Sequence, residues 1–355
     1  MTTSTEALLD ISGLTKTFPV PQGLISRWRG QPVRTVRALT DVTLSVRRGE
    51  TLGIVGESGC GKSTLARTLV RLYTADSGAV RYGGQDVLAL KGAELRGYNR
   101  RVQMIFQDPY SSLNPRMTVG QMLREALGVH HMRPPAQIPA RVSELLNLVG
   151  LPPEAAGRLP HEFSGGQRQR IGIARALALE PECLIADELV SALDVSVQAQ
   201  VVNLLLELQE RLNLTVLFVA HDLRLVRHLS HRVAVMYLGR VVEVADTDAI
   251  FGAPKHPYTQ GLLAAAPTLD PGSRSAEPAI QGELPSPLDV PSGCAFRTRC
   301  KQALDRCASE RPPLLDTGGG HQVACHLYTS PEAISPKTTS PKTISPETAS
   351  APGQL

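Results

Sequence analysis

The sequence has few aromatic residues, no long apolar run and no block of like charges. Aromatic side chains make up only 4% of its 355 residues, and the single tryptophan, Trp28, is expected to pack against a sheet rather than to contact a ligand. No eighteen apolar residues run together, which argues against a membrane-spanning helix. Residues 1–10 lack the basic and apolar segments of a secretion signal. We therefore expect a globular protein that is made and kept in the cytosol.

The charged residues and the cysteines narrow the possible partners only slightly. The formal net charge of +4 comes from dispersed arginines, without the concentrated basic tail that binds nucleic acid. Six cysteines in a reducing compartment favour thiols or metal ligands over disulfides. Four of them lie late, at Cys294, Cys300, Cys307 and Cys325, and their gaps of five, six and seventeen residues are wider than those of a zinc knuckle.

Apolar strands and amphipathic helices alternate through most of the chain. Apolar runs at 52–55, 102–106, 183–186 and 214–220 predict buried strands, and helices are expected at 63–72, 167–179 and 196–212. This alternation is typical of an α/β fold with a parallel sheet. Residues 78–84 and 233–244 favour hairpins, the second turning at Leu238-Gly239.

Four segments are expected from changes in composition and periodicity. They are a nucleotide-binding domain at 7–252, a helical subdomain inserted within it at about 118–162, a cysteine-bearing extension at 253–328, and a tail at 329–355. The tail repeats Ser-Pro-Lys/Glu-Thr three times and has too few apolar residues to fold.

A glycine-rich motif follows the predicted strand at 52–55 and precedes a predicted helix. Gly56 to Ser63 reads G-E-S-G-C-G-K-S, the pattern of a nucleotide phosphate-binding loop. Its backbone N–H groups and the helix N-terminus suit the β-phosphate, Lys62 can bridge the β- and γ-phosphates, and Ser63 can coordinate Mg²⁺. The predicted nucleotide-binding residues here are Gly56, Glu57, Ser58, Gly59, Cys60, Gly61, Lys62, Ser63 and Thr64.

Two carboxylates follow the apolar strand at 183–186. Asp187 can hold hydrated Mg²⁺, and Glu188 can orient or deprotonate an attacking water. Acidic residues at a strand end are often only solvated turn residues. The phosphate-binding loop supplies the phosphate that this pair requires, so we predict that both carboxylates belong to the same site.

Between these motifs, Phe163-Ser164-Gly165-Gly166-Gln167-Arg168-Gln169-Arg170 resembles the signature of the ABC ATPases. The resemblance implies the ABC ATPase fold, with a RecA-like parallel-sheet core, an antiparallel β subdomain and an inserted α-helical subdomain. In that family two cassettes dock head to tail around two ATP molecules. Ser164, Gly165, Gly166 and Gln167 are therefore expected to contact the nucleotide held by a second subunit, at a helix start suited to phosphate.

Several single positions gain roles from the same resemblance. Gln107 resembles the glutamine that touches Mg²⁺ and the attacking water, and His221 resembles the histidine that contacts the γ-phosphate. Phe18 resembles the aromatic that stacks on adenine. Ser191-Ala192-Leu193-Asp194 resembles the loop that crosses the dimer interface. Leu189 departs from the family's usual proline, which affects the expected turnover rate more than the assignment.

Three further segments resemble the peptide and nickel importer branch: residues 106–115, 160–163 and 256–260. This resemblance implies two membrane permeases, a second ATPase subunit and an extracytoplasmic solute-binding protein. It also implies a position at the cytoplasmic face of the membrane. Di- or oligopeptides are the expected solute, with nickel or another small solute as the alternative. The four late cysteines then resemble ligands of a four-iron, four-sulfur cluster, with zinc or uncommitted thiols as the other possibilities.

Two other functions fit the sequence less well. A soluble ABC ATPase acting on nucleic acid typically has two cassettes or a long coiled coil, whereas this chain has one cassette and no sustained heptads. A regulator that no longer hydrolyses ATP is disfavoured by Glu188 and His221. The sequence thus predicts an ATP hydrolase that energises peptide uptake.

Overall fold

The computed structural model describes residues 6–21, 28, 33–108, 112–191, 193–265, 280 and 282–329. Two sheets organise these residues. The larger sheet has eight strands, in the spatial order β11 (Leu315–Asp316), β12 (Gln322–Val323), β10 (Arg240–Asp246), β9 (Arg232–Tyr237), β3 (Thr51–Val55), β8 (Thr215–Val219), β7 (Cys183–Asp187) and β6 (Val102–Ile105). The smaller sheet is antiparallel, in the order β2 (Thr35–Arg47), β1 (Ala7–Pro19), β4 (Ser77–Tyr82) and β5 (Gln85–Asp86).

The centre of the larger sheet is parallel and fully buried. Strand β3 pairs in parallel with β8 and β9, and β7 pairs in parallel with β8 and β6. Every residue of β3, β7 and β8 is buried, as the unbroken apolar runs predict for strands covered on both faces. The predicted α/β class with a parallel core and an antiparallel subdomain is confirmed.

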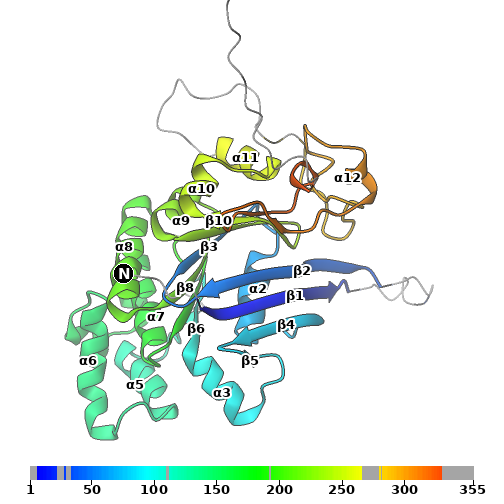
Figure 1. The fold of residues 1–355 in the computed structure, drawn as a ribbon. Coiled ribbons are helices and arrows are strands. Elements are labelled where there is room, and N and C mark those ends of the chain that lie inside the picture. The colour runs from blue at the N-terminus through cyan, green and yellow to red at the C-terminus, as the bar shows by residue number, and fades with distance from the viewer. Residues whose placement is uncertain are drawn as a thin grey trace, which may run out of the picture.

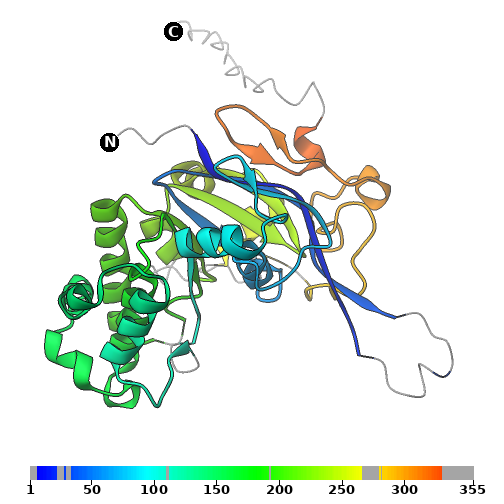
Figure 2. The same cartoon turned by 90° about the horizontal axis from the view of Figure 1, so that it is seen from below.

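Helices cover the larger sheet and also form a separate lobe (Figure 1). The lobe contains α5 (Val119–Val129), α6 (Ile138–Leu148) and the start of α7 (Gly165–Leu177), inserted between β6 and β7. The remaining helices are α2 (Lys62–Leu69), α3 (Gly92–Arg101), α8 (Val195–Leu212), α9 (Leu223–Leu229), α10 (Thr247–Gly252), α11 (Pro257–Ala264) and α12 (Arg306–Ser309). Figure 2 shows the lobe and the long β1–β2 pair on opposite sides of the molecule. No helix among the described residues has the length and apolar character needed to cross a bilayer.

Two helices differ in extent from the sequence-based expectation. Helix α7 starts at Gly165 rather than Gln167, because the Ser164 side chain accepts a bond from the Gln167 N–H and the Gln167 side chain bonds back to the Ser164 N–H. Helix α2 ends at Leu69 rather than Leu72, and Arg71 then adopts a left-handed φ of 63° that stops the helix.

The cysteine-bearing extension joins the sheet and the core of the cassette. Strand β12 pairs with β10 at Glu243↔Val323 and Val244↔Gln322. Tyr258 of α11 is fully buried, and its ring lies 4.7 Å from the ring of Tyr237. The boundary at residue 252 stays a prediction, since the residues on its two sides share one sheet.

Two other expectations fall at the edges of the described chain. Trp28 lies in the sequence between β1 and β2, and its side chain is 91% exposed. The prediction that it packs against the sheet is therefore wrong. The predicted tail lies outside the described residues except for Thr329.

A buried carboxylate links β10 to the extension. Glu243 is 0% exposed and accepts hydrogen bonds from the Lys255 N–H at 2.6 Å, the His256 N–H at 3.1 Å and His321 Nε2 at 2.6 Å. Burial opposes ionisation, but these hydrogen bonds outweigh it and lower the pKa of Glu243 below its ordinary value of 4.5. The ionised carboxylate therefore stabilises the docked extension.

Replacing Glu243 by Ala is expected to lower the free energy of unfolding by about 3 kcal/mol, because several buried donors lose their acceptor. Denaturant unfolding measures this, and Glu283→Ala, at an exposed position of the same extension, is the control. Because the folded-state pKa is lowered, the contribution of Glu243 is complete above its unfolded pKa and is lost as the pH falls through the folded pKa. An equal loss from both variants would contradict this role.

Candidate functional site

The glycine-rich loop between β3 and α2 has the backbone shape that its motif predicts. Gly56 has a φ of 151° and Gly61 a φ of 106°. A Cβ at Gly56 would lie 2.2 Å from the carbonyl oxygen of Met236, and one at Gly61 would lie 2.3 Å from that of Ala38. Only glycine fits at these two positions. We name residues 56–63 the phosphate loop.

Lys62 lies inside the phosphate loop. Its side chain is buried, and Nζ donates to the carbonyl oxygens of Gly56 at 2.7 Å and Glu57 at 3.1 Å. The ammonium group is therefore held at the centre of a ring of backbone, beside the N-terminus of α2. A buried cation at this place is suited to binding a phosphate group.

Ser63 and Asp187 meet at the ends of α2 and β7. The Ser63 hydroxyl donates to Asp187 Oδ1 at 2.8 Å, and Asp187 Oδ2 is buried with no partner among the described residues. Burial raises the pKa of Asp187, against the lowering effect of the Ser63 bond. A hydroxyl and an unpartnered carboxylate oxygen form a donor set of the kind that Mg²⁺ prefers.

Glu188 and Gln107 meet at the same edge of the sheet. Gln107 Nε2 donates to Glu188 Oε2 at 2.6 Å and lies 3.5 Å from the Ser191 hydroxyl. Glu188 has a left-handed φ of 47°, and its N–H donates to the Val219 carbonyl of β8 at 2.9 Å. His221, which follows β8, lines the same small pocket as Glu188. The predicted Gln107, Glu188 and His221 are thus brought together.

Phe18 and the segment after α2 form an aromatic contact at the edge of the β subdomain. The Phe18 ring lies 5.2 Å from that of Tyr73 in an edge-to-face arrangement, and Lys16 Nζ lies 5.2 Å from the Phe18 centroid. Arg67 of α2 donates to the Tyr73 hydroxyl at 3.3 Å. Phe18 is therefore connected to the helix that begins at the phosphate loop, but its contact with a base stays a prediction.

The signature residues lie at the start of α7. Ser164 and Gln167 are exposed at the start of α7, and a Cβ at Gly166 would lie 2.3 Å from a methyl of Val197 in α8. A Cβ at Gly165 would lie 3.1 Å from the side chain of Leu193, so the signature lies against the loop that follows Glu188. None of Ser164, Gly165, Gly166 and Gln167 lines the pocket that contains Glu188.

Leu189 and the predicted interface loop at 191–194 follow Glu188 in the sequence. Leu189 is buried at 1% exposure, directly after Glu188. The Gln198 side chain, in α8, donates to the carbonyls of Val190 at 3.0 Å and Leu193 at 2.8 Å, on either side of the start of the loop 191–194. Ala192 of this loop lies outside the described residues. Leu189 fills the core where a proline was expected.

The four late cysteines line one small pocket in the extension, and none is in a disulfide. Burial raises the pKa of Cys294 and Cys300, and it raises the pKa of Cys325 to about 11. The neighbouring cysteine thiols shift these pKa values in the same direction. Within the described ranges, however, no group of three or more His, Cys, Asp or Glu side chains is placed to hold a metal ion. The structure gathers the thiols but does not by itself define a metal centre.

Sequence reasoning missed two residues of the extension that touch the phosphate loop. Arg299 forms two parallel ion-pair contacts with Glu57, at 2.7 and 2.9 Å, and the Tyr258 hydroxyl accepts from the Glu57 N–H at 2.9 Å. The hydrogen bonds to Glu57 raise the pKa of Arg299 above its ordinary range. Glu57 and Arg299 are 242 positions apart in the sequence, so no local signal could have predicted this contact.

Comparison with known proteins agrees with this geometry. The ABC transporter family profile matches residues 39–191, and the profile of the oligopeptide/dipeptide transporter C-terminal region matches residues 242–307. Two solved structures share the fold. CbiO1 of Clostridium perfringens, from the CbiONQ ABC transporter complex, has 25% identity and a TM-score of 0.58 over 70% of this chain and 91% of that one. The dimeric cassette MJ0796 bound to ADP and phosphate has 27% identity and a TM-score of 0.57 over 67% of this chain and 98% of that one.

The phosphate loop, the acidic end of β7 and the inserted helical lobe define a cassette ATPase of the ABC type. Similarity to curated proteins narrows the assignment. A probable peptide ABC transporter ATP-binding protein, y4tS of Sinorhizobium fredii, is 53% identical over 91% of this chain and 90% of its own. The oligopeptide transport ATP-binding protein AppF of Bacillus subtilis is 50% identical over 91% and 98%. The chain belongs to the ABC transporter ATP-binding proteins of the oligopeptide/dipeptide family, ATPases that drive transport.

Proposed function

We propose that this chain binds MgATP at the phosphate loop and hydrolyses it to power peptide import. The observation that carries the proposal is the pair of bonds Ser63–Asp187 and Gln107–Glu188, which join the loop, the acidic strand end and the glutamine at one edge of the parallel strands. Phosphate, metal and water ligands are needed together for phosphoryl transfer.

Each residue then has a defined task. Lys62 exchanges its loop carbonyls for the β- and γ-phosphates, and Ser63 and Asp187 would hold Mg²⁺, which neutralises charge on the phosphates. Glu188 orients and polarises the attacking water, while Gln107 holds the Glu188 carboxylate in place. His221 contacts the γ-phosphate from the end of β8, and Phe18 stacks on the adenine.

A second cassette completes the site. Ser164 and Gln167 are exposed at a helix start, and their partner is the nucleotide on the facing subunit, together with the N–H groups of Gly165 and Gly166. The dimeric MJ0796 structures support this arrangement. The second cassette is either another copy of this chain or a related ATPase.

The solute is a di- or oligopeptide, which passes through two permease subunits after delivery by an extracytoplasmic binding protein. Support comes from the family of residues 242–307 and from the names of the relatives. The chain docks at the cytoplasmic face of the membrane. Nickel or another small solute is the alternative cargo in the same branch.

Reconstitution tests this function directly. The chain is purified with its permease subunits, placed in proteoliposomes with the binding protein, and supplied with MgATP and a labelled peptide mixture. We expect peptide accumulation and peptide-stimulated hydrolysis. Stimulation by nickel alone would replace the peptide assignment, and copurification with nucleic acid without permeases would overturn transport.

We further propose that Cys294, Cys300, Cys307 and Cys325 hold an iron–sulfur cluster with a structural role. The support is that all four line one pocket, and thiolates are the preferred ligands of such clusters. Anaerobically purified protein is expected to be brown and to contain iron and sulfide, and Cys300→Ala to be colourless. Zinc in a colourless protein, or no metal at all, would reject the cluster.

The contact between the extension and the phosphate loop gives a further prediction. Replacing Arg299 by Ala is expected to weaken MgATP binding about tenfold, because Glu57 loses a partner whose side chain is only 6% exposed. A fluorescent ATP analogue reports the affinity. Arg297→Ala is the matched control, since the Arg297 side chain donates to Ser292 and to no residue of the described phosphate loop. Equal affinities of the two variants would remove Arg299 from the nucleotide site.

A further inference from the structure

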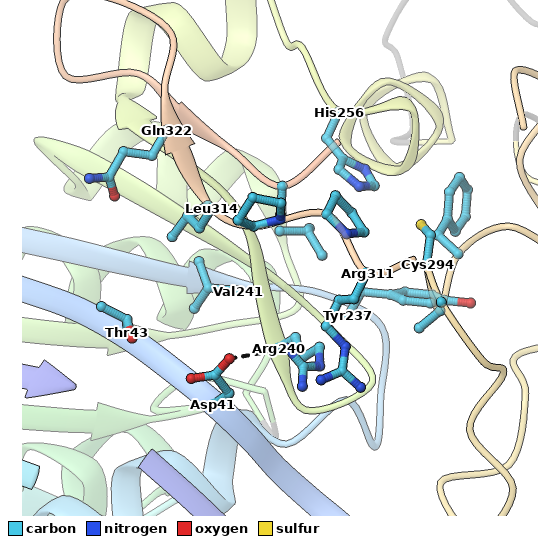
Figure 3. Close-up of a pocket in the computed structure, with 17 residues that line it drawn as sticks. Asp41, Thr43, Tyr237, Arg240, Val241, His256, Cys294, Arg311, Leu314 and Gln322 are labelled. Atoms are coloured by element: carbon cyan, nitrogen blue, oxygen red, sulfur yellow. Dashed lines mark ion pairs between the residues drawn. The ribbon is translucent and has the colours of Figure 1, made fainter. Parts of the chain in front are cut away.

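A second cavity is lined by none of the phosphate-loop residues 56–63. It has a volume of about 400 Å³ and opens between β2, the β9–β10 hairpin and the cysteine-bearing extension. This is within the range of small-molecule sites. Figure 3 shows Arg240, Arg311 and Asp41 at one end of the cavity. We name it the hairpin pocket.

Arg240 is a largely buried cation with too few partners. Its side chain is 16% exposed, Nη2 is buried without a hydrogen bond, and the nearest carboxylate is Asp41 at 3.6 Å. Asp41 is itself 65% exposed, so solvent weakens its attraction for Arg240. Burial, followed by the charge of Arg311, lowers the pKa of Arg240 to about 10. A buried guanidinium in this state is costly unless an anion is added.

Arg311 strengthens the positive character of the same end. It forms no hydrogen bond or ion pair with any described residue, and it faces the pocket beside Arg240. His256, which also lines the pocket, stays neutral because burial lowers its pKa to about 4. Two arginines and one aspartate leave a single positive charge to be balanced.

The other wall of the hairpin pocket is apolar. Val241, Leu314, Phe296 and the prolines 312 and 313 line it. Apolar walls bind a hydrocarbon body, and two guanidinium groups bind a carboxylate in a bidentate manner. We propose that the hairpin pocket is a binding site for a small organic monoanion, a carboxylate with an apolar body, seated on Arg240 and Arg311.

The experiment uses the full chain and para-trifluoromethylbenzoate, followed by fluorine NMR. We expect saturable binding with a dissociation constant in about the millimolar range, as for other small fragments. Arg240→Met and Arg311→Ala should each weaken binding about tenfold. Arg116→Ala removes the same charge at an exposed site outside the pocket and should leave binding unchanged. Exposed Arg311 provides the test even where the Arg240 variant fails to fold.

Two other ligands define the chemistry of the site. The neutral para-trifluoromethylbenzyl alcohol should bind about tenfold more weakly than para-trifluoromethylbenzoate. Phenyl phosphate should also bind more weakly than para-trifluoromethylbenzoate. Absence of carboxylate binding, equal binding by the Arg311 variant, or tighter binding of the alcohol or the phosphate would each overturn the proposal. MgATP retention, measured in parallel, keeps this result separate from the proposed transport function.

Discussion

Glu188→Gln is expected to lower the rate of ATP hydrolysis about a hundredfold or more while MgATP binding is retained. The amide keeps the size of the carboxylate and can still accept from Gln107 Nε2, which lies 2.6 Å from Glu188 Oε2. It cannot accept a proton from water, and loss of a general base typically costs about 10² to 10⁴ in rate. Phosphate release and equilibrium nucleotide binding, measured on the same preparation, separate chemistry from affinity.

The matched control for this change is Glu207→Gln. Glu207 lies exposed on α8 and carries the same charge, so its replacement should leave both hydrolysis and binding near the level of the unmodified protein. Normal hydrolysis by the Glu188 variant would remove Glu188 from the chemistry and leave positioning of the site as its only role.

Lys62→Ala is expected to weaken MgATP binding about a hundredfold or more, because the phosphates lose their buried cationic partner. The same change leaves the carbonyls of Gly56 and Glu57 without their donor, which costs about 1–3 kcal/mol in an unliganded loop. These two effects can be distinguished. In thermal unfolding, the unmodified protein should be stabilised by MgATP, and the variant should show no shift with nucleotide.

Lys91→Ala removes an exposed lysine before α3 and serves as the control. Its melting temperature should rise with MgATP as that of the unmodified protein does. If the Lys62 variant were still stabilised by MgATP to the same extent, the phosphate loop would not be the nucleotide site.

The parts of this structure that sequence could predict are those with a local physical signal. The hairpin turn at Leu238-Gly239 is an example, since both residues have a left-handed φ, 42° and 78°, and the apolar runs on either side pair as antiparallel strands. The phosphate loop is another, because its glycines, lysine and serine are contiguous and lie between a strand and a helix. The pair Asp187 and Glu188 was placed correctly at a strand end for the same reason.

The contacts that sequence could not predict join distant segments. Strands β11 and β12 have two residues each, too few to show an alternation, so their addition to the main sheet gave no pattern. The start of α7 was missed because a capping box fixes it through side-chain bonds rather than apolar periodicity. Trp28 was misassigned since hydrophobicity alone does not say which aromatic finds a partner.

The pairing of β10 with β12 has a practical consequence for anyone who shortens the chain. A fragment that stops at residue 252 would leave the outer backbone of Glu243 and Val244 without hydrogen-bond partners, and an open strand of this kind recruits strands from other molecules. Such a fragment should aggregate rather than give a soluble, minimal ATPase domain. The smallest useful fragment therefore includes Ala324, whose N–H bonds to the Val242 carbonyl at 2.8 Å, and continues past Cys325, which lines the cysteine pocket.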